Sequence, residues 1–200
     1  MLVERLGSVG RRMAMPRSFR RLRQRSESCW RNRALPRKAP RWQRLHARAK
    51  YSFWRLRGGA AQNALASADD LTGKVLIDAT NPLLPGLTGL AAGTTTSAGE
   101  VVAKWAAGAR VVKAFNTVGL NIMADPRFDR GRAAMFYCGE DAKAKDTVAS
   151  LISELGFEAL DAGPVTQARL LEPHALLWIS LALQNGYGLE IAFQLLRRKN

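Results

Sequence analysis

Two short segments of the sequence place polar side chains directly after apolar runs, where they could bind a small molecule. Asn81 and Pro82 follow the run 74–80, and the run 110–116 ends in Asn116. In open α/β sheets, ligands bind beyond the carboxyl ends of the strands, so amide side chains there can hydrogen bond a cofactor. Asn and Thr also form ordinary turns, because their side chains hydrogen bond to loop backbone. The spacing alone leaves a ligand site and a plain turn both open.

A third segment, near the N-terminus, has part of a pattern that binds dinucleotides. Gly7 and Gly10 fit the second and third glycines of the G-x-G-x-x-G turn, which holds a pyrophosphate at a helix N-terminus. The first glycine position is Arg5, and only glycine serves there without a side-chain clash. We therefore expect a damaged phosphate-binding turn.

The elements that would position these residues show clear local signals. Four apolar runs bounded by turn residues predict strands over 74–80, 110–116, 133–138 and 157–161. Ser97 and Glu100 form a capping box ahead of a short helix that Gly108 ends. Asp141 caps a longer helix, ended by Gly156. Its apolar residues share one helical face: Ala144, Val148, Leu151, Ile152 and Leu155.

The last stretch, about 166–198, is helical in pattern. Pro173 suits a helix start or a kink. Gly186 and Gly188 interrupt the run, and we expect residues 189–196 to resume it. Because strands and helices alternate along the chain, the sequence predicts an α/β fold with a parallel sheet and right-handed crossovers.

Basic residues are concentrated at the N-terminal end of the chain. The 200 residues include 31 Lys and Arg against 16 Asp and Glu, a formal net charge of +15. Residues 1–60 carry 18 of the basic residues and only two acids, whereas 61–200 is almost neutral. We therefore divide the chain into an Arg-rich segment, 1–57, and a globular body, 58–200.

Composition also excludes several classes of protein. Hydrophobic residues make up 47% of the chain, which argues against disorder throughout. No apolar run approaches the ~18 residues that cross a membrane, and the first residues lack the core of a secretory signal. Cys29 and Cys138 alone cannot form a disulfide framework or a zinc site. We expect a cytoplasmic protein with no metal and no membrane partner.

The body resembles the NADP oxidoreductases that depend on the deazaflavin coenzyme factor 420, whose Rossmann-type module is shared with the STEAP metalloreductases. The match covers about 58–200, and its motifs occur in the family's order. They are the segments 73–82, 97–100, 111–117, 138–143, 155–157, 161–164 and 171–173.

The resemblance implies a Rossmann-type parallel sheet with flanking helices, with N-terminal strands missing or degenerate and a helical C-terminal end. It implies hydride transfer between NADP(H) and the deazaflavin coenzyme as co-substrate, a reaction that needs no catalytic acid or base, and we assign no catalytic residue. It also implies a homodimer through the C-terminal helices. Ala114 would be small enough for close approach of a ring. The cofactor-binding residues it implies are Gly7, Gly10, Asn81, Pro82, Ala114, Phe115 and Asn116.

Residues 15–57 do not match the family, and three interpretations compete. The segment resembles an out-of-frame translation of a GC-rich gene, which would leave the phosphate-binding turn damaged and the chain inactive. Alternatively, it is a basic arm that binds nucleic acid, with arginines on phosphates and Trp30, Trp42 and Trp54 stacked on bases. A third interpretation is an Arg-rich targeting segment. We take the first as our expectation and nucleic-acid binding as the alternative function.

Overall fold

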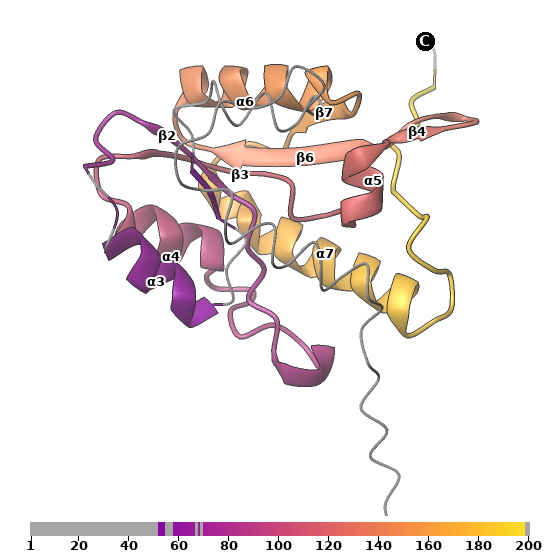
Figure 1. The fold of residues 1–200 in the computed structure, drawn as a ribbon, viewed down its shortest axis with the longest axis horizontal. Helices are drawn as coiled ribbons and strands as arrows, with labels where there is room; N and C mark the ends of the chain where they lie inside the picture. The colour runs from indigo at the N-terminus through magenta and orange to yellow at the C-terminus, as the bar shows by residue number, and fades with distance from the viewer. Residues whose placement is uncertain (1–51, 55–57, 67, 69, 199–200) are drawn as a thin grey trace, which may run out of the picture.

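The computed structural model describes residues 52–54, 58–66, 68 and 70–198. Within them, one sheet has the strand order β1-β2-β3-β6-β7 (Figure 1). Its strands are β1 (Ser52–Trp54), β2 (Val75–Asp78), β3 (Arg110–Lys113), β6 (Ala134–Gly139) and β7 (Glu158–Asp161), and a separate hairpin pairs β4 (Arg127–Phe128) with β5 (Gly131–Arg132). The α-helices are α3 (Gly58–Ala66), α4 (Ala98–Trp105), α5 (Leu120–Ala124), α6 (Ala142–Glu154) and α7 (Ala168–Leu183).

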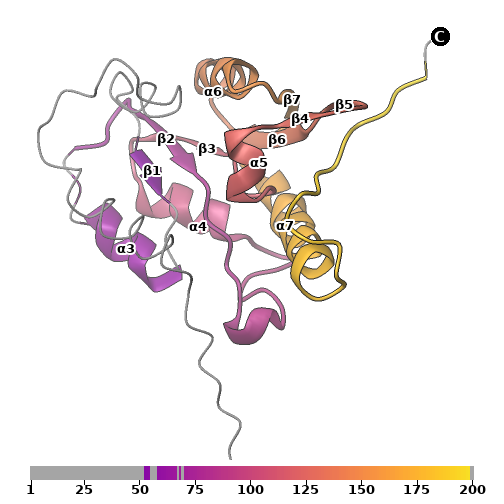
Figure 2. The ribbon, with the colours of Figure 1, turned by 45° about the vertical axis from the view of Figure 1, so that its right-hand side comes forward.

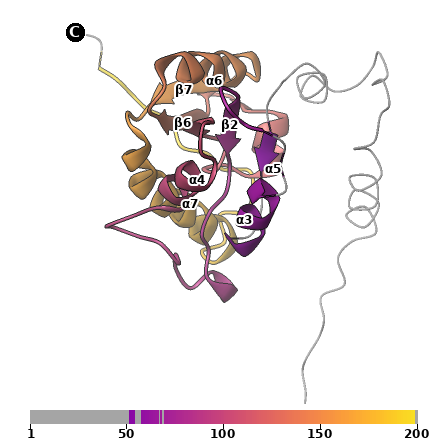
Figure 3. The same cartoon turned by 90° about the vertical axis from the view of Figure 1, so that its left-hand side faces the viewer.

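Helices cover both faces of the sheet, as the two side views show (Figures 1 and 3). Helix α6 lies on one face, and helices α3, α4 and α7 lie on the other. Successive strand residues point to opposite faces, so Leu76 packs in the α3–α4 cluster while Ile77 packs in the α6 cluster. This gives the α/β, Rossmann-type architecture that the sequence predicts.

The predicted direction of the last two strands is wrong. Strands β1, β2 and β3 are parallel, but β6 pairs with β3 in the antiparallel direction, with Lys113 opposite Cys138. Strand β7 is parallel to β6. The connection from β3 to β6 contains the five-residue α5 and the β4–β5 hairpin, which do not carry the chain back along the sheet as a crossover helix would. The carboxyl ends of β2 and β3 therefore meet at one edge, and those of β6 and β7 at the other.

The two predicted helix starts are confirmed. The Ser97 side chain accepts a hydrogen bond from the Glu100 amide, and the Asp141 side chain accepts one from the Ala144 amide. The face of α6 that the spacing predicts is the buried one, with Ala144, Val148 and Ile152 all 0% exposed.

Helix α5 and the β4–β5 hairpin were not predicted from the sequence, and neither were the first two elements of the described chain. Strand β1 lies inside the Arg-rich segment, where no strand was expected, and pairs with β2 so that Phe53 is opposite Ile77. Helix α3 follows at Gly58, beside α4 (Figure 2). The other residues of 1–57 lie outside the described part of the chain.

The C-terminal segment is not helical beyond α7, which corrects the prediction for residues 189–196. Gly186 and Gly188 adopt positive φ angles of 76°, and the chain then runs back past β6 without a helix (Figures 1 and 2). The backbone of this segment instead accepts hydrogen bonds from the rest of the protein. Ala134 N donates to Phe193 O, and Trp178 Nε1 donates to Ile191 O. Tertiary hydrogen bonds and packing thus replace the intrahelical bonds that the local pattern indicated.

Among the described residues, no helix is both long and apolar enough to cross a membrane.

Candidate functional site

The carboxyl ends of β2 and β3 are joined by a pair of asparagines. Asn81 Nδ2 donates to the backbone oxygen of Asn116 at 2.9 Å, and Asn116 Nδ2 donates to Asn81 Oδ1 at 3.0 Å. Asn116 Nδ2 also donates to the backbone oxygen of Leu171 at 3.2 Å, which connects the pair to α7. The two loops that the sequence singled out are therefore in direct contact.

The loop after β3 combines burial with an unusual backbone conformation. Ala114 and Phe115 are 0% and 3% exposed, and both belong to the core cluster on the α6 side. Phe115 has a φ of +63°, the left-handed region, which bulky residues rarely adopt. Such backbone strain is concentrated at ligand-binding and catalytic sites because the surrounding structure must enforce it.

The loop after β2 begins at Pro82 and folds back on itself. The backbone oxygen of Pro82 accepts a hydrogen bond from Ala91 N at 2.7 Å, and Leu83 pairs with Leu90 in an isolated bridge. Pro82 is buried, while Asn81 beside it is half-buried. Pro82 therefore anchors the base of this loop, and Asn81 contacts the neighbouring loop.

Beneath these loops lies a buried ion network that the sequence analysis did not identify as a site. Lys113 Nζ lies 2.9 Å from Asp78 Oδ2 and 3.0 Å from Glu172 Oε1. It also donates to the backbone oxygen of Thr80 at 2.8 Å. All three charged side chains are at most 1% exposed. Burial alone would lower the pKa of Lys113, but the Asp78 and Glu172 carboxylates hold it above its ordinary value.

Glu172 also caps the N-terminus of α4. Its two carboxylate oxygens accept hydrogen bonds from Ala98 N and Gly99 N, at 3.0 and 2.9 Å. These amides are among the helix donors that otherwise lack partners and attract phosphates. Because Glu172 already bonds them, this helix end is unsuited to hold the pyrophosphate of a dinucleotide.

Close packing at Gly99 makes this cap possible. A Cβ at Gly99 would lie 2.8 Å from the Cβ of Ala168 and 3.1 Å from the Cδ of Lys113. Contacts under 3.0 Å force neighbouring atoms to move, so a side chain here would separate α4 from α7 and from the buried lysine. Gly99 lies within the capping-box motif, but no local pattern indicated this contact.

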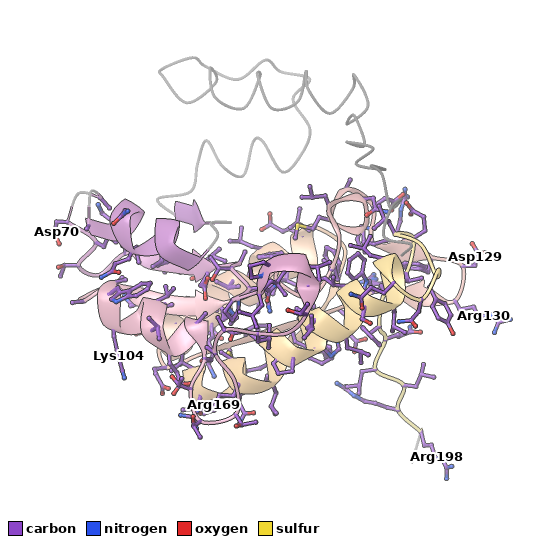
Figure 4. All side chains as sticks on the ribbon, turned by 90° about the horizontal axis from the view of Figure 1, so that it is seen from below. Asp70, Lys104, Asp129, Arg130, Arg169 and Arg198 are labelled. Carbon is purple, nitrogen blue, oxygen red and sulfur yellow. The ribbon has the colours of Figure 1, made fainter. Side chains whose placement is uncertain are left out.

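A second, partly exposed ion pair connects the same two helices at the surface. Arg169 donates to both carboxylate oxygens of Glu100, at 2.9 and 2.7 Å, and Ser97 Oγ donates to one of them. The Arg169 guanidinium lowers the pKa of the Glu100 carboxyl to about 2. Arg169 lies at the surface (Figure 4), whereas the lysine network is fully internal.

The other reactive side chains of the body are packed rather than poised for chemistry. Burial raises the pKa of the Cys138 thiol to about 12, so it remains protonated at neutral pH. The His174 ring contacts the rings of Phe136 and Phe193 edge-on, at centroid distances of 5.2 and 4.4 Å, and burial lowers its pKa. No group of three His, Cys, Asp or Glu in the described part of the chain is placed to hold a metal.

The predicted site residues thus fall into two groups. The structure brings Asn81, Pro82, Ala114, Phe115 and Asn116 together at one sheet edge. Gly7 and Gly10 lie outside the described residues. The missed residues did leave a signal, because Asp78 and Lys113 are charges at the ends of apolar runs, and Glu172 is four residues after Ala168 on the apolar stripe of α7.

Comparison with known proteins assigns the chain to a family. A protein from Arthrobacter sp. FB24, provisionally named a factor-420-dependent NADP reductase, is 34% identical to the chain. The match covers 72% of this chain and 68% of that one, with a TM-score of 0.66. The chain belongs to the factor-420-dependent NADP reductase family. It therefore has the fold of an NADP-dependent oxidoreductase, as the motifs predicted.

Two further proteins are similar to this member of the reductase family. The first has a lower sequence identity, and the second matches the chain over a smaller share of its own length. A hypothetical protein of Sinorhizobium meliloti is 27% identical, with 62% of each chain covered and a TM-score of 0.57. The metalloreductase STEAP3 of Rattus norvegicus is 34% identical over 106 residues, which are 52% of this chain and 20% of STEAP3. The chain thus corresponds to about a fifth of that longer protein. No family model matches the chain.

Proposed function

We propose that this chain binds NADP(H) at the carboxyl ends of β2 and β3 and holds a deazaflavin coenzyme beside it, as an NADPH:deazaflavin oxidoreductase. The observation that carries the proposal is the Asn81–Asn116 pair, which joins the two loops at this edge. Family membership supports both the cofactor and the reaction type. When bound, the nicotinamide supplies or accepts a hydride, and that chemistry requires positioning rather than an acid or base.

The loops fit the nicotinamide end of such a cofactor. Both asparagine side chains are neutral amides, and one of their atoms, Asn116 Oδ1, is buried without a hydrogen-bond partner in the structure. A neutral carboxamide group offers the N–H donors that this oxygen can accept. Ala114 is 0% exposed, so the close approach of a ring at this position would require the residues that cover it to move.

The ion network would fix the two loops for this task. Lys113 and Asp78 lie opposite each other in neighbouring strands, three residues before Asn116 and Asn81 respectively. Glu172, which lies on α7, contacts Lys113 and accepts hydrogen bonds from the first amides of α4. We propose that these residues position the asparagine pair without touching the cofactor. Because the α4 amides are already bonded, this proposal leaves the pyrophosphate to the turn at Gly7 and Gly10, which we expect Arg5 at the first glycine position to weaken.

A binding titration on the full chain tests the proposal. NADPH fluorescence is followed at low and high salt in the wild type and in Asn81→Ala, with Ser150→Ala on the exposed side of α6 as the matched control. We expect saturable binding at both salt concentrations, weakened about tenfold by Asn81→Ala and unchanged by Ser150→Ala. NADPH oxidation should then depend on added deazaflavin. Absence of saturable NADPH binding would contradict the proposal.

Binding that is lost at high salt would instead favour the basic segment as a nucleic-acid-binding arm. That alternative rests on residues 1–57, of which only the β1 strand is described.

We also propose that the chain forms a homodimer through α7. Helix α7 exposes three leucine side chains to solvent. Leu170 is 65% exposed, Leu177 51% and Leu183 57%. Leu170 and Leu177 are seven residues apart and share one face of the helix, and burying them against another chain would remove them from water. A second copy would present the same leucines in a symmetric interface.

A further inference from the structure

The chain beyond α7 packs most closely on the body over three residues. Residues 191–193, which we call the strap, are half-buried, whereas 184–190 before them and 194–198 after them are exposed. The stretch before the strap contains Gly186 and Gly188, and nothing lies within 4 Å of a Cβ at either position. The segment runs from α7 past α5 (Figure 2). Because glycine restricts the backbone least, the position of the strap depends mainly on its own contacts.

The strap is bonded to two different elements of the body. Ile191 O accepts a hydrogen bond from Trp178 Nε1 of α7, and Phe193 O accepts one from Ala134 N at the start of β6, each at 2.8 Å. The ring of Phe193 packs edge-on against that of His174, which lies about one turn before Trp178 in α7. The indole N–H is the only hydrogen-bond donor of a tryptophan side chain, so the strap fixes the orientation of Trp178.

Trp178 in turn packs against the loop that carries Asn116. It is 6% exposed, and a Cβ at Gly119 would lie 2.7 Å from its Cη2 atom, so a side chain there would push the indole away. Gly119 is three residues after Asn116 and is the N-cap of α5. Ala192 of the strap packs against the core cluster that includes Phe115, the residue directly before Asn116. The strap therefore reaches this loop on both sides of Asn116, through Trp178 on one side and through the core cluster on the other.

We infer that the strap and Trp178 hold the loop after β3 in the conformation that places Asn116 beside Asn81, so that docking of the strap and binding of the cofactor are coupled. The identity of the ligand rests on the proposed function, whereas the contacts between strap and loop do not. The left-handed conformation of Phe115 persists only where the surrounding structure enforces it, and Ala192 belongs to that surrounding structure. Trp178 and the strap are thus positioning residues that act through the loop. By reciprocity, a ligand that requires the ordered loop must also stabilise the docked strap.

Amide hydrogen exchange on the wild-type chain tests the contact between strap and loop without any ligand. The Ala134 amide donates to Phe193 O and reports release of the strap, whereas the Met123 amide donates to Gly119 O and reports opening of the loop. We expect both amides to exchange through one opening, with protection factors that agree within about threefold and fall in parallel as urea is added. The Ile152 amide, in α6 on the other face of the sheet, should stay more protected. Unequal protection at Ala134 and Met123 would overturn the inference.

NADPH binding to the full chain gives the second test. Phe193→Ala removes the ring that packs on His174 and leaves the backbone acceptor in place. We expect it to bind NADPH about fivefold more weakly than the wild type, near the lower end of the usual coupling between sites. Leu196→Ala, at an 82% exposed position of the same segment, is the matched control and should bind as the wild type does. Saturating NADPH should slow exchange at Ala134 in the wild type by at least the same factor.

The outcomes separate this inference from the proposed function. A purely structural role of Phe193 would lower the Tm of Phe193→Ala and leave its NADPH affinity unchanged, which would overturn the inference. NADPH binding that leaves exchange at Ala134 unchanged would also overturn it, and the proposed function would stand. If the wild type binds no NADPH, the proposed function fails. Exchange then still decides whether the strap holds the loop, because parallel protection at Ala134 and Met123 supports this and unequal protection refutes it.

Discussion

The Nζ atom of Lys113 lies 3.0 Å from Oε1 of Glu172, a contact that joins strand β3 to helix α7 through the interior of the protein. The same ammonium group contacts Asp78 on the neighbouring strand, so one cation offsets two buried carboxylates. The two α4 amide groups that donate hydrogen bonds to Glu172 add further positive potential at its carboxylate. These contacts connect four elements directly beneath the asparagine pair, which makes Lys113 the central residue of the site's support.

Replacing Lys113 with methionine should strongly destabilise the protein. The substitution keeps most of the side-chain volume but leaves Asp78 and Glu172 as unpaired buried carboxylates. We expect a loss of about 3–5 kcal/mol in the free energy of unfolding, the usual cost of breaking a buried pair from one side. Lys145→Met is the matched control, because Lys145 pairs with the exposed Asp161 and should cost about 0–1 kcal/mol. Urea unfolding measures both, and similar losses would contradict the central role of Lys113.

Adding a methyl group at Gly99 should also destabilise the fold, by a steric route. In Gly99→Ala the new Cβ would lie 2.8 Å from Ala168 Cβ, so α4 and α7 must separate. Overpacking of this kind costs about 1–3 kcal/mol, and thermal melts would show it as a lower Tm. Gly93→Ala is the control, since nothing lies within 4 Å of a Cβ at Gly93. A Gly99→Ala protein that melts like Gly93→Ala would show that the contact relaxes freely.

The Glu100–Arg169 pair should make stability depend on pH in acid. Arg169 lowers the pKa of Glu100 from 4.5 to about 2 in the folded protein. Because the folded pKa lies below the unfolded one, the contribution is fully present above about pH 4.5 and is lost as the pH falls toward 2. Across this window the wild type should lose stability more steeply than Glu100→Gln in urea unfolding. Glu154→Gln, at an exposed position of α6, should keep the wild-type slope, and equal slopes in all three proteins would refute the assignment.

If the chain dimerises through α7, a charged side chain on the exposed face of this helix should prevent the dimer from forming. Leu177→Glu would place a carboxylate in the symmetric interface, where two copies repel and must be desolvated. Sedimentation should find a dimer for the wild type and a monomer for Leu177→Glu. Leu120→Glu, at an exposed leucine of α5, should remain dimeric. A monomeric wild type at micromolar concentration would contradict the dimer.

Much of the fold was predictable from the sequence because its signals are local. The apolar face of α6 follows from residue spacing within thirteen residues, and the Ser97 and Asp141 caps each require only three further positions. The strands over 74–80 and 110–116 were predicted for the same reason, and in the structure they end earlier, at Asp78 and Lys113. The resemblance, in turn, identified Asn81 and Asn116, whose mutual contact the structure shows.

Only the tertiary structure determined the features that depend on distant residues. The antiparallel direction of β6, the course of residues 189–196 along the body and the convergence of Lys113, Asp78 and Glu172 each join segments far apart in the chain. Apolar periodicity specifies which residues are buried but not what they are buried against. The sequence of an apolar run that ends in a charged residue is therefore the same whether that charge contacts water or an opposite charge in the folded protein. In the folded chain two carboxylates, Asp78 and Glu172, contact Lys113, and these contacts make it the centre of a buried ion network.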